Sequence, residues 1–135
     1  NEKPKASVCG EVITNKQHAF YSYEAKYLDE KGAELEILAK ISKETQKNIQ
    51  DLAVRTFKVL ECEGLSRVDF FLMPDGEILV NEINTIPGFT NISMYPTLWK
   101  NTGISYSKLI DKLINLAIER FKKEQKLQTS IKIKK

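Results

Sequence analysis

The stretch RVDFFLMPDGEILVNEIN, residues 67 to 84, constrains the fold more than any other part of the chain. Apolar and polar residues alternate on both sides of Asp75-Gly76, a dipeptide typical of two-residue turns between antiparallel strands. The pattern predicts a β-hairpin, and its register should be well specified because a one-residue slip would expose the core side. Five apolar residues are expected on that core side: Val68, Phe70, Leu72, Leu79 and Ile83.

The opposite face of the predicted hairpin carries polar groups where strands usually have Val, Ile or Thr. A two-residue turn at Asp75-Gly76 places Asp69 opposite Glu82 and Arg67 opposite Asn84. Four apolar residues should continue this face toward the turn, in the opposed pairs Phe71 with Val80 and Met73 with Ile78. Directly opposed carboxylates repel each other, so a positive group is expected between them.

Two groups could supply that positive charge. Arg67 would make an ordinary surface ion pair, worth at most about 1 kcal/mol. A divalent cation is the alternative, because Mg²⁺ prefers hard oxygen ligands such as those of Asp69, Glu82 and Asn84 and usually also takes phosphate oxygens. The spacing of the residues leaves both interpretations open.

The remaining segments predict an α+β fold, with a mainly antiparallel sheet packed against helices. Extended segments are expected at residues 6 to 14, interrupted at Gly10, at 19 to 27, and at 35 to 38. Apolar residues at three- and four-residue spacing predict helices at 43 to 62, at 97 to 102, and from about 105 onward. Ser42 is the expected N-cap of the first of these helices.

The net charge of +3 is unevenly distributed, because residues 122 to 135 hold six Lys and one Glu. We expect one compact lobe over residues 1 to 121 and a solvated Lys-rich tail over 122 to 135, with little support for nucleic-acid binding. No apolar run approaches a membrane span. Cys9 and Cys62 lack metal-ligand spacing, which favours reduced thiols in the cytoplasm. The opening at Asn1 suggests a piece of a longer protein.

Several motifs carry a resemblance to a known family. YEAKY, RVDFF, NEINTIPGFT and SMYP, in this order, resemble the carboxy-terminal part of D-alanine–D-alanine ligases of the ATP-grasp superfamily. The closing run PTLWKNTGISYSKLIDKLINLAIER is similar to versions from Gram-positive bacteria. The resemblance extends over essentially the whole chain.

The resemblance implies an enzyme that uses ATP to phosphorylate one D-alanine and joins the acyl phosphate to the amine of a second. It also implies two Mg²⁺ ions, for which Mn²⁺ can substitute. Asp69 and Glu82 match the ligands of one ion, and Glu82 and Asn84 match those of the other. This ligand set falls on the polar face predicted above.

Other motif positions match residues that contact the phosphates and the reacting atoms. Arg67 matches an arginine at the transferring phosphoryl group and the acyl oxygen. Lys26 matches a phosphate-binding lysine of a mobile loop, and Tyr27 a tyrosine that closes that loop over the site. Gly88 matches an amide that stabilises the tetrahedral oxyanion.

A further set of matches concerns the nucleotide and the second substrate. Ser93 and Met94 match the pair that holds the second D-alanine, whose carboxylate the serine hydroxyl takes. Phe20 and Phe71 match apolar positions around adenine, although both are also ordinary core aromatics, and Asn81 falls with Glu82 among the nucleotide contacts.

The match is incomplete in two respects. Leu38 stands where most relatives have Pro, and the parts of the family that precede the metal lobe have no counterpart, so the chain is expected to be inactive alone.

The tyrosine that opens YEAKY favours D-alanine over D-lactate as second substrate, and a full-length enzyme should be a cytoplasmic homodimer serving peptidoglycan synthesis. Another ATP-grasp carboxylate–amine ligase and a non-catalytic module are the alternatives.

Overall fold

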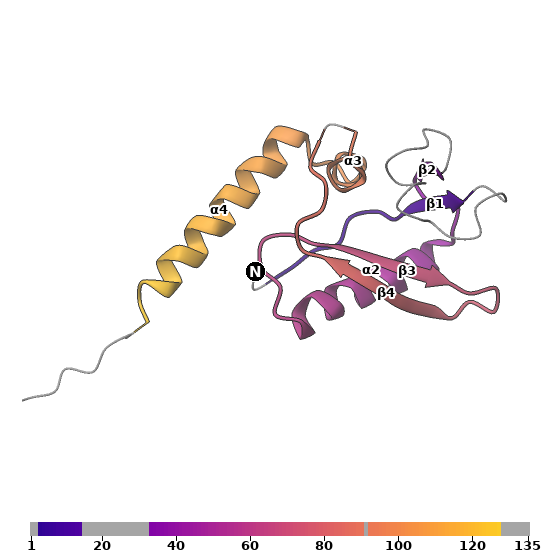
Figure 1. Cartoon of the computed structure of the whole chain (residues 1–135), viewed down its shortest axis with the longest axis horizontal. Coiled ribbons are helices and arrows are strands. Elements are labelled where there is room, and N and C mark those ends of the chain that lie inside the picture. Colours follow the sequence, from indigo (N-terminus) through magenta and orange to yellow (C-terminus); the bar gives the residue numbers. More distant parts are fainter. Residues whose placement is uncertain (1–2, 15–32, 91, 128–135) are drawn as a thin grey trace, which may run out of the picture.

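The structure is a computed structural model that describes residues 3–14, 33–90 and 92–127 (Figure 1). Its elements are, in chain order, β1 (Gly10–Thr14), β2 (Ala33–Ile37), α2 (Lys43–Val59), β3 (Arg67–Leu72), β4 (Ile78–Asn84), α3 (Met94–Asn101) and α4 (Tyr106–Glu124). The described strands form two antiparallel pairs, β1 with β2 and β3 with β4. The α+β prediction is therefore confirmed, whereas the strand expected at 19 to 27 lies outside the described residues. None of the helices in these ranges could cross a membrane.

The first strand pair supports α3. β1 begins at Gly10, where the sequence predicts an interruption, and Gly10 pairs with Ile37 of β2. A Cβ atom built on Gly10 would come within 3.0 Å of Leu98 Cδ2 and 3.3 Å of Met94 Cε. Since real Cβ atoms rarely approach so closely, the missing side chain is what lets α3 lie against this strand.

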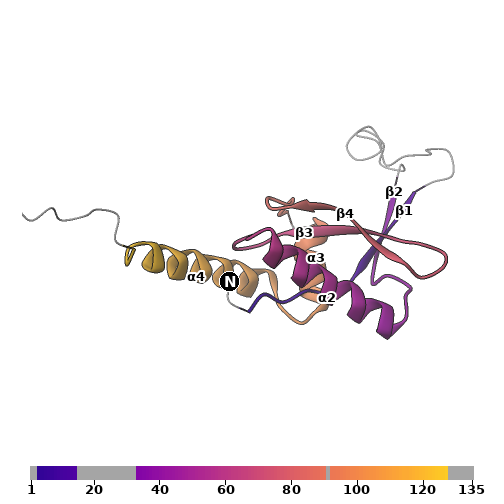
Figure 2. The ribbon, with the colours of Figure 1, turned by 90° about the horizontal axis from the view of Figure 1, so that it is seen from below.

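α2 begins where the sequence predicts. The Ser42 hydroxyl accepts a hydrogen bond from the Thr45 amide at 3.0 Å, which satisfies one of the free amides of the first turn. The helix ends at Val59, earlier than expected, because Glu61 adopts a left-handed φ of 50° before Gly64. α2 runs along one face of the β3–β4 hairpin (Figure 2), and its Phe57 is buried.

The hairpin turn has three residues, so the two-residue turn predicted from Asp75-Gly76 is wrong. The Gly76 amide donates to the Met73 carbonyl, and the Met73 amide donates to the Glu77 carbonyl, both at 2.9 Å. Pro74 suits the first corner of such a turn. Gly76 alone then takes the left-handed position, with a φ of 90°.

A β-bulge follows in β4. Asp69 pairs with Glu82 but Phe70 pairs with Val80, which leaves Asn81 without a partner residue in β3. The bulge compensates for the longer turn, so the pairs Asp69–Glu82 and Arg67–Asn84 form as predicted.

Between the turn and the bulge, the predicted pairs and faces are wrong. Phe71 pairs with Leu79, and Leu72 pairs with Ile78, so the predicted pairs of Phe71 with Val80 and Met73 with Ile78 do not form. Leu79 thus belongs to the polar face, and Ile78 and Val80 belong to the helix side. Val80 lines a shallow hollow with residues of α2 and its C-terminal end: Leu52, Arg55, Thr56, Val59 and Leu60.

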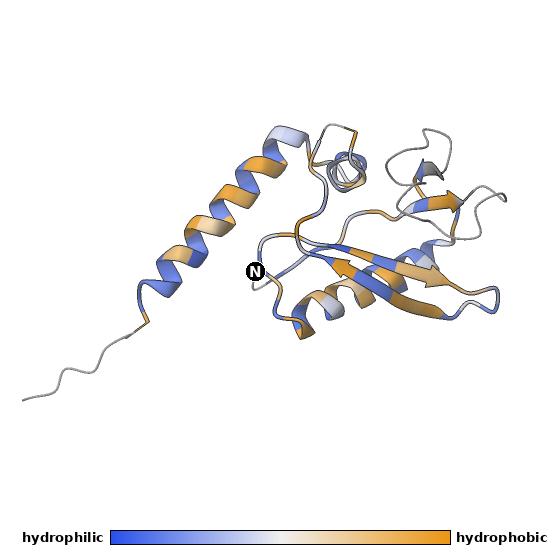
Figure 3. Ribbon diagram, viewed as in Figure 1, coloured by the Kyte–Doolittle hydropathy of each residue, from blue (hydrophilic) through white to orange (hydrophobic). Residues whose placement is uncertain are grey.

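The two last helices follow the PGFT loop, residues 87 to 90. α3 starts at Met94, earlier than the expected 97, and the Ser105 hydroxyl accepts from the Lys108 amide at the start of α4. α4 continues past residue 121 to Glu124 and projects from the rest of the molecule (Figure 1), with apolar and polar residues alternating along it (Figure 3). Phe121 is 61% exposed. Within the described residues, much of the apolar stripe of α4 is exposed, while Leu113, Leu116 and Ala117 line a hollow with residues 63 to 65.

Candidate functional site

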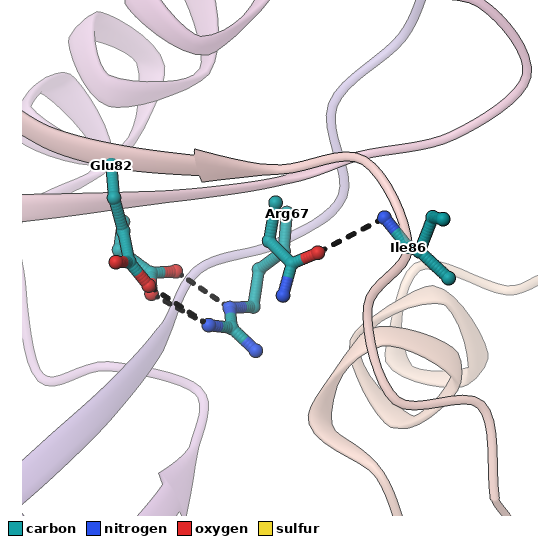
Figure 4. A network of polar contacts seen from close by, with 5 residues as sticks. Arg67, Glu82 and Ile86 are labelled. Atoms are coloured by element: carbon teal, nitrogen blue, oxygen red, sulfur yellow. Dashed lines mark hydrogen bonds and ion pairs between the residues drawn. The ribbon is translucent and has the colours of Figure 1, made fainter.

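Four charged or amide side chains gather at the end of the hairpin away from the turn, and we call them the ionic face: Arg67, Asp69, Glu82 and Asn84. Strand alternation places all four on the side of the sheet opposite α2. Arg67 donates to both oxygens of Asp69, from Nε at 2.7 Å and from Nη2 at 2.9 Å, and Nη2 lies 3.4 Å from Glu82 Oε1 (Figure 4). The guanidinium therefore bridges the two opposed carboxylates by contacting both.

Asn84 links the ionic face to the following loop. Its side-chain oxygen accepts a hydrogen bond from the Ile86 amide at 2.9 Å (Figure 4). Asparagine commonly closes such a turn onto its own backbone two residues later. One lone pair of this oxygen is thereby used, and a second one is left for another partner.

The donor set of the ionic face fits a hard divalent cation. Two carboxylates and an amide oxygen are ligands that Mg²⁺ takes, leaving further positions for water or phosphate. Nowhere in residues 3–14, 33–90 and 92–127 do three or more His, Cys, Asp or Glu side chains cluster as a metal site by themselves. An ion here would thus need Asn84, and it would compete with Arg67 for the Asp69 oxygens.

The predicted nucleotide contacts on the hairpin are exposed. Phe71 continues the ionic face toward the turn, where it pairs with Leu79 and is 56% exposed. Asn81 is the exposed bulge residue next to Glu82. These side chains present an apolar and an amide surface beside the charged groups.

Aromatic rings hold the PGFT loop against the helices. The Phe89 ring lies 5.7 Å from that of Tyr95 on α3 and 5.5 Å from that of Tyr106 on α4. The Tyr106 hydroxyl also donates to the Phe89 carbonyl at 2.9 Å. Burial raises the pKa of Tyr95, which keeps the phenol neutral. The loop that carries Gly88 is therefore fixed from two sides.

Ser93 lies directly beside Gly88. A Cβ atom built on Gly88 would be 3.2 Å from Ser93 Oγ. The Ser93 hydroxyl accepts from the Thr90 amide at 2.9 Å and lies 2.8 Å from Thr90 Oγ1. Thr90 was not among the residues predicted from the sequence, although threonine and serine hydroxyls commonly bond to nearby backbone groups in such local turns.

Of the remaining predicted site residues, the structure describes only Met94. Met94 is the first residue of α3, and its Cε lies near Gly10 of β1. Lys26, Tyr27 and Phe20 lie outside the described residues.

The fold and this site define the class of the protein. The solved structures that share its fold include D-alanine–D-alanine ligases and a D-Ala:D-Ser ligase, so the chain is an ATP-grasp lobe of the α+β class. A family model described as "D-ala D-ala ligase C-terminus" matches residues 1–115. The chain therefore belongs to this family.

Individual relatives agree with the family model. A D-alanine--D-alanine ligase of Oceanobacillus iheyensis is 58% identical over 130 residues, which are 96% of this chain and 35% of that protein. The VanG D-Ala:D-Ser ligase of Enterococcus faecalis aligns with a TM-score of 0.71 at 44% identity, over 82% of this chain and 31% of that one. A Bacillus anthracis D-alanine–D-alanine ligase complexed with ATP aligns with a TM-score of 0.69 at 30% identity, over 87% and 37% of the two chains. This chain thus spans about a third of the length of its relatives.

Proposed function

We propose that this chain is the metal- and phosphate-binding lobe of an enzyme that joins two D-alanines at the expense of ATP. The observation that carries the proposal is the ionic face, in which Asp69 and Glu82 lie side by side and share one cationic partner, Arg67. The names of the relatives support D-alanine as the substrate, and the ATP complex of the Bacillus anthracis enzyme supports the nucleotide.

The reaction in this proposal has two steps. The carboxylate of the first D-alanine takes the terminal phosphoryl group of ATP, and ADP leaves. The amine of the second D-alanine then attacks the acyl phosphate, and inorganic phosphate leaves. Such chemistry depends on positioning and charge neutralisation more than on covalent help from the protein.

The ionic face would neutralise the phosphates. Asp69 and Glu82 would hold one Mg²⁺ or Mn²⁺ ion, and Glu82 and Asn84 a second. The bound ions would supply positive charge at the phosphate oxygens. Arg67 would place its guanidinium on the transferring phosphoryl group and the acyl oxygen, as planar bidentate donors suit phosphate.

The PGFT loop would act on the second step. The Gly88 amide would donate to the oxygen that becomes negative when the amine attacks, a role in which fixed backbone donors are effective. Ser93 and Met94 would hold the second D-alanine, with the Ser93 hydroxyl donating to its carboxylate. Gly88 and Ser93 are adjacent, as this division of roles requires.

The nucleotide would lie on the exposed strip beside the ionic face. Phe71 would pack on adenine together with Phe20, and Asn81 would contact the nucleotide next to Glu82. Lys26 would reach the phosphates and Tyr27 would help to close the site. The dipeptide would serve peptidoglycan synthesis, and a full-length cytoplasmic enzyme would be a homodimer.

A titration of the chain with Mn²⁺ and ADP tests the metal assignment. Unmodified chain should bind the metal with nucleotide, and Glu82→Gln should abolish this binding because one carboxylate serves both ions. Glu77→Gln is the matched control, since Glu77 lies on the same hairpin at its exposed turn. Equal binding by Glu82→Gln and unmodified chain would refute the assignment.

A second candidate differs only in the acceptor. The likeness to the Enterococcus faecalis D-Ala:D-Ser ligase favours D-serine as second substrate. The upstream two thirds of the Oceanobacillus iheyensis ligase can be fused to this chain, and phosphate release can be measured with D-alanine, D-serine and D-lactate as acceptors. We expect D-alanine to give the highest kcat/KM, and a higher value with D-serine would select the second candidate.

A further inference from the structure

Ser93 occupies a helix N-cap but does not act as one. Its backbone is extended, with φ −66° and ψ 143°, and α3 begins at the next residue, yet its side chain makes no capping hydrogen bond. A serine in this position usually accepts from an amide of the first helical turn. Instead its carbonyl accepts from the Thr97 hydroxyl at 2.8 Å, while its hydroxyl is turned back toward Thr90.

Thr90 and Ser93 hold each other through three contacts. The Ser93 amide donates to the Thr90 carbonyl at 3.0 Å, and the Thr90 amide donates to Ser93 Oγ at 2.9 Å. The two hydroxyl oxygens lie 2.8 Å apart. A serine hydroxyl has one hydrogen to donate and two lone pairs to accept with, so these contacts decide how many of each remain.

We propose that Thr90 is a positioning residue that makes the Ser93 hydroxyl a hydrogen-bond donor toward an anionic acceptor substrate. When Thr90 donates both its amide and its hydroxyl hydrogen to Ser93 Oγ, both lone pairs of that oxygen are filled. The Ser93 hydrogen must then point away from Thr90. This inference rests on the proposed function, in which Ser93 meets the carboxylate of the second D-alanine.

The arrangement selects for charge in the acceptor. A hydroxyl whose lone pairs are used repels a further donor and favours a carboxylate, which only accepts. Because residue 88 is glycine, no side chain crowds this hydroxyl, whose oxygen would lie only 3.2 Å from a Cβ built there. Thr90 therefore acts on binding of the acceptor, whereas Gly88 acts on its reaction.

The test uses the fusion of this chain to the upstream two thirds of the Oceanobacillus iheyensis ligase. Thr90→Val removes the hydroxyl and keeps the branched shape, and Thr90→Ser keeps the hydroxyl and removes the methyl group. Loss of one charge-assisted hydrogen bond predicts that Thr90→Val raises the KM for the second D-alanine about tenfold. The kcat and the KM for ATP should stay within about twofold, and Thr90→Ser should restore the parental KM.

A double-mutant cycle separates positioning from packing. If Thr90 acts through Ser93, Thr90→Val should add nothing to the KM of a Ser93→Ala variant. If Ser93 instead donates its hydrogen to Thr90, the Thr90→Val variant frees that hydrogen. The KM of this variant for the second D-alanine should then equal or fall below the parental KM, and this result would overturn the inference. Equal KM values for Thr90→Val and Thr90→Ser overturn it as well.

Failure of the two proposals can be told apart. A parental fusion without dipeptide formation overturns the proposed function, and this inference with it. An active parent with insensitive Thr90 variants overturns the inference alone. Melting curves establish that each variant is folded, and Thr90→Ala is the second hydroxyl-free variant if valine prevents folding.

Discussion

Replacing Arg67 by glutamine should destabilise the chain in the absence of metal. The Arg67–Asp69 pair is bidentate, and the two side chains are only 27% and 34% exposed. Hydrogen bonds to charged groups are worth about 1.5–3 kcal/mol, and Arg67→Gln also leaves the carboxylates of Asp69 and Glu82 facing each other. With a discount for partial exposure, we expect a loss of about 1.5 kcal/mol.

The chain contains a matched control for this variant. Arg120 Nε lies 2.7 Å from Glu124 Oε1, the same distance as Arg67 Nε from Asp69 Oδ1, but these side chains are 56% and 53% exposed. Because exposed ion pairs on a helix contribute little, Arg120→Gln should cost clearly less stability than Arg67→Gln.

Urea denaturation followed by circular dichroism, without added metal, measures both losses. Adding Asp69→Asn to the Arg67→Gln variant should recover part of the stability, since it removes the uncompensated charge. Equal losses for Arg67→Gln and Arg120→Gln, or no recovery in the double variant, would show that the position of the guanidinium on the hairpin does not matter to the fold.

Two further predictions concern other parts of the molecule. Gly10→Ala should lower the free energy of unfolding in urea by about 1–2 kcal/mol, because its Cβ would meet Leu98 at 3.0 Å. Gly76→Ala should cost a similar amount for a different reason, since its Cβ would meet nothing within 4 Å but its φ is left-handed. An unchanged stability of Gly10→Ala would contradict the close packing of α3 on β1. Burial raises the pKa of Cys9 above its usual 9.0, so the neutral thiol contributes its full stability below pH 9. That contribution is lost as the pH rises through the folded-state pKa. The urea midpoint should therefore fall over this pH range, and it should fall less in the Cys9→Ala variant.

Local signals in the sequence predicted the starts of α2 and α4 well. Ser42 and Ser105 both accept from an amide of the first turn of their helices, because a capping hydroxyl depends only on its immediate neighbours. Ser93 shows where this reasoning fails. It also precedes a helix, but Thr90 takes its hydroxyl, and that partnership depends on how the PGFT loop folds back.

The hairpin was predicted correctly at one end and wrongly at the other. Val68 and Ile83 must face α2, so the register at the ionic face follows from the need to bury them. Near the turn, both possible turn lengths suit the Pro-Asp-Gly sequence, and no residue type marks Asn81 as a bulge. The change of face of Ile78, Leu79 and Val80 could therefore not be predicted from the sequence.

The family resemblance supplied what local patterns could not. The alternation of residues predicted that Asp69 and Glu82 lie together, but it left the choice between a metal and an ion pair open. The structure shows Arg67 in contact with both carboxylates. Gly88 and Ser93 were singled out by their motif alone. Tyr106, which donates to Phe89 from a helix 17 positions later, had no signal in the sequence near the loop.

The extra residue in β4 makes an unusual deletion permissible. If Asn81 were excised, Val80 and Glu82 would become neighbours with opposite orientation, and each would keep its present cross-strand partner, Phe70 or Asp69. The shortened strand would be straighter, yet no carboxylate would change sides. The nucleotide contact proposed for Asn81 and the cation binding proposed for Glu82 are thus separable by the loss of a single codon.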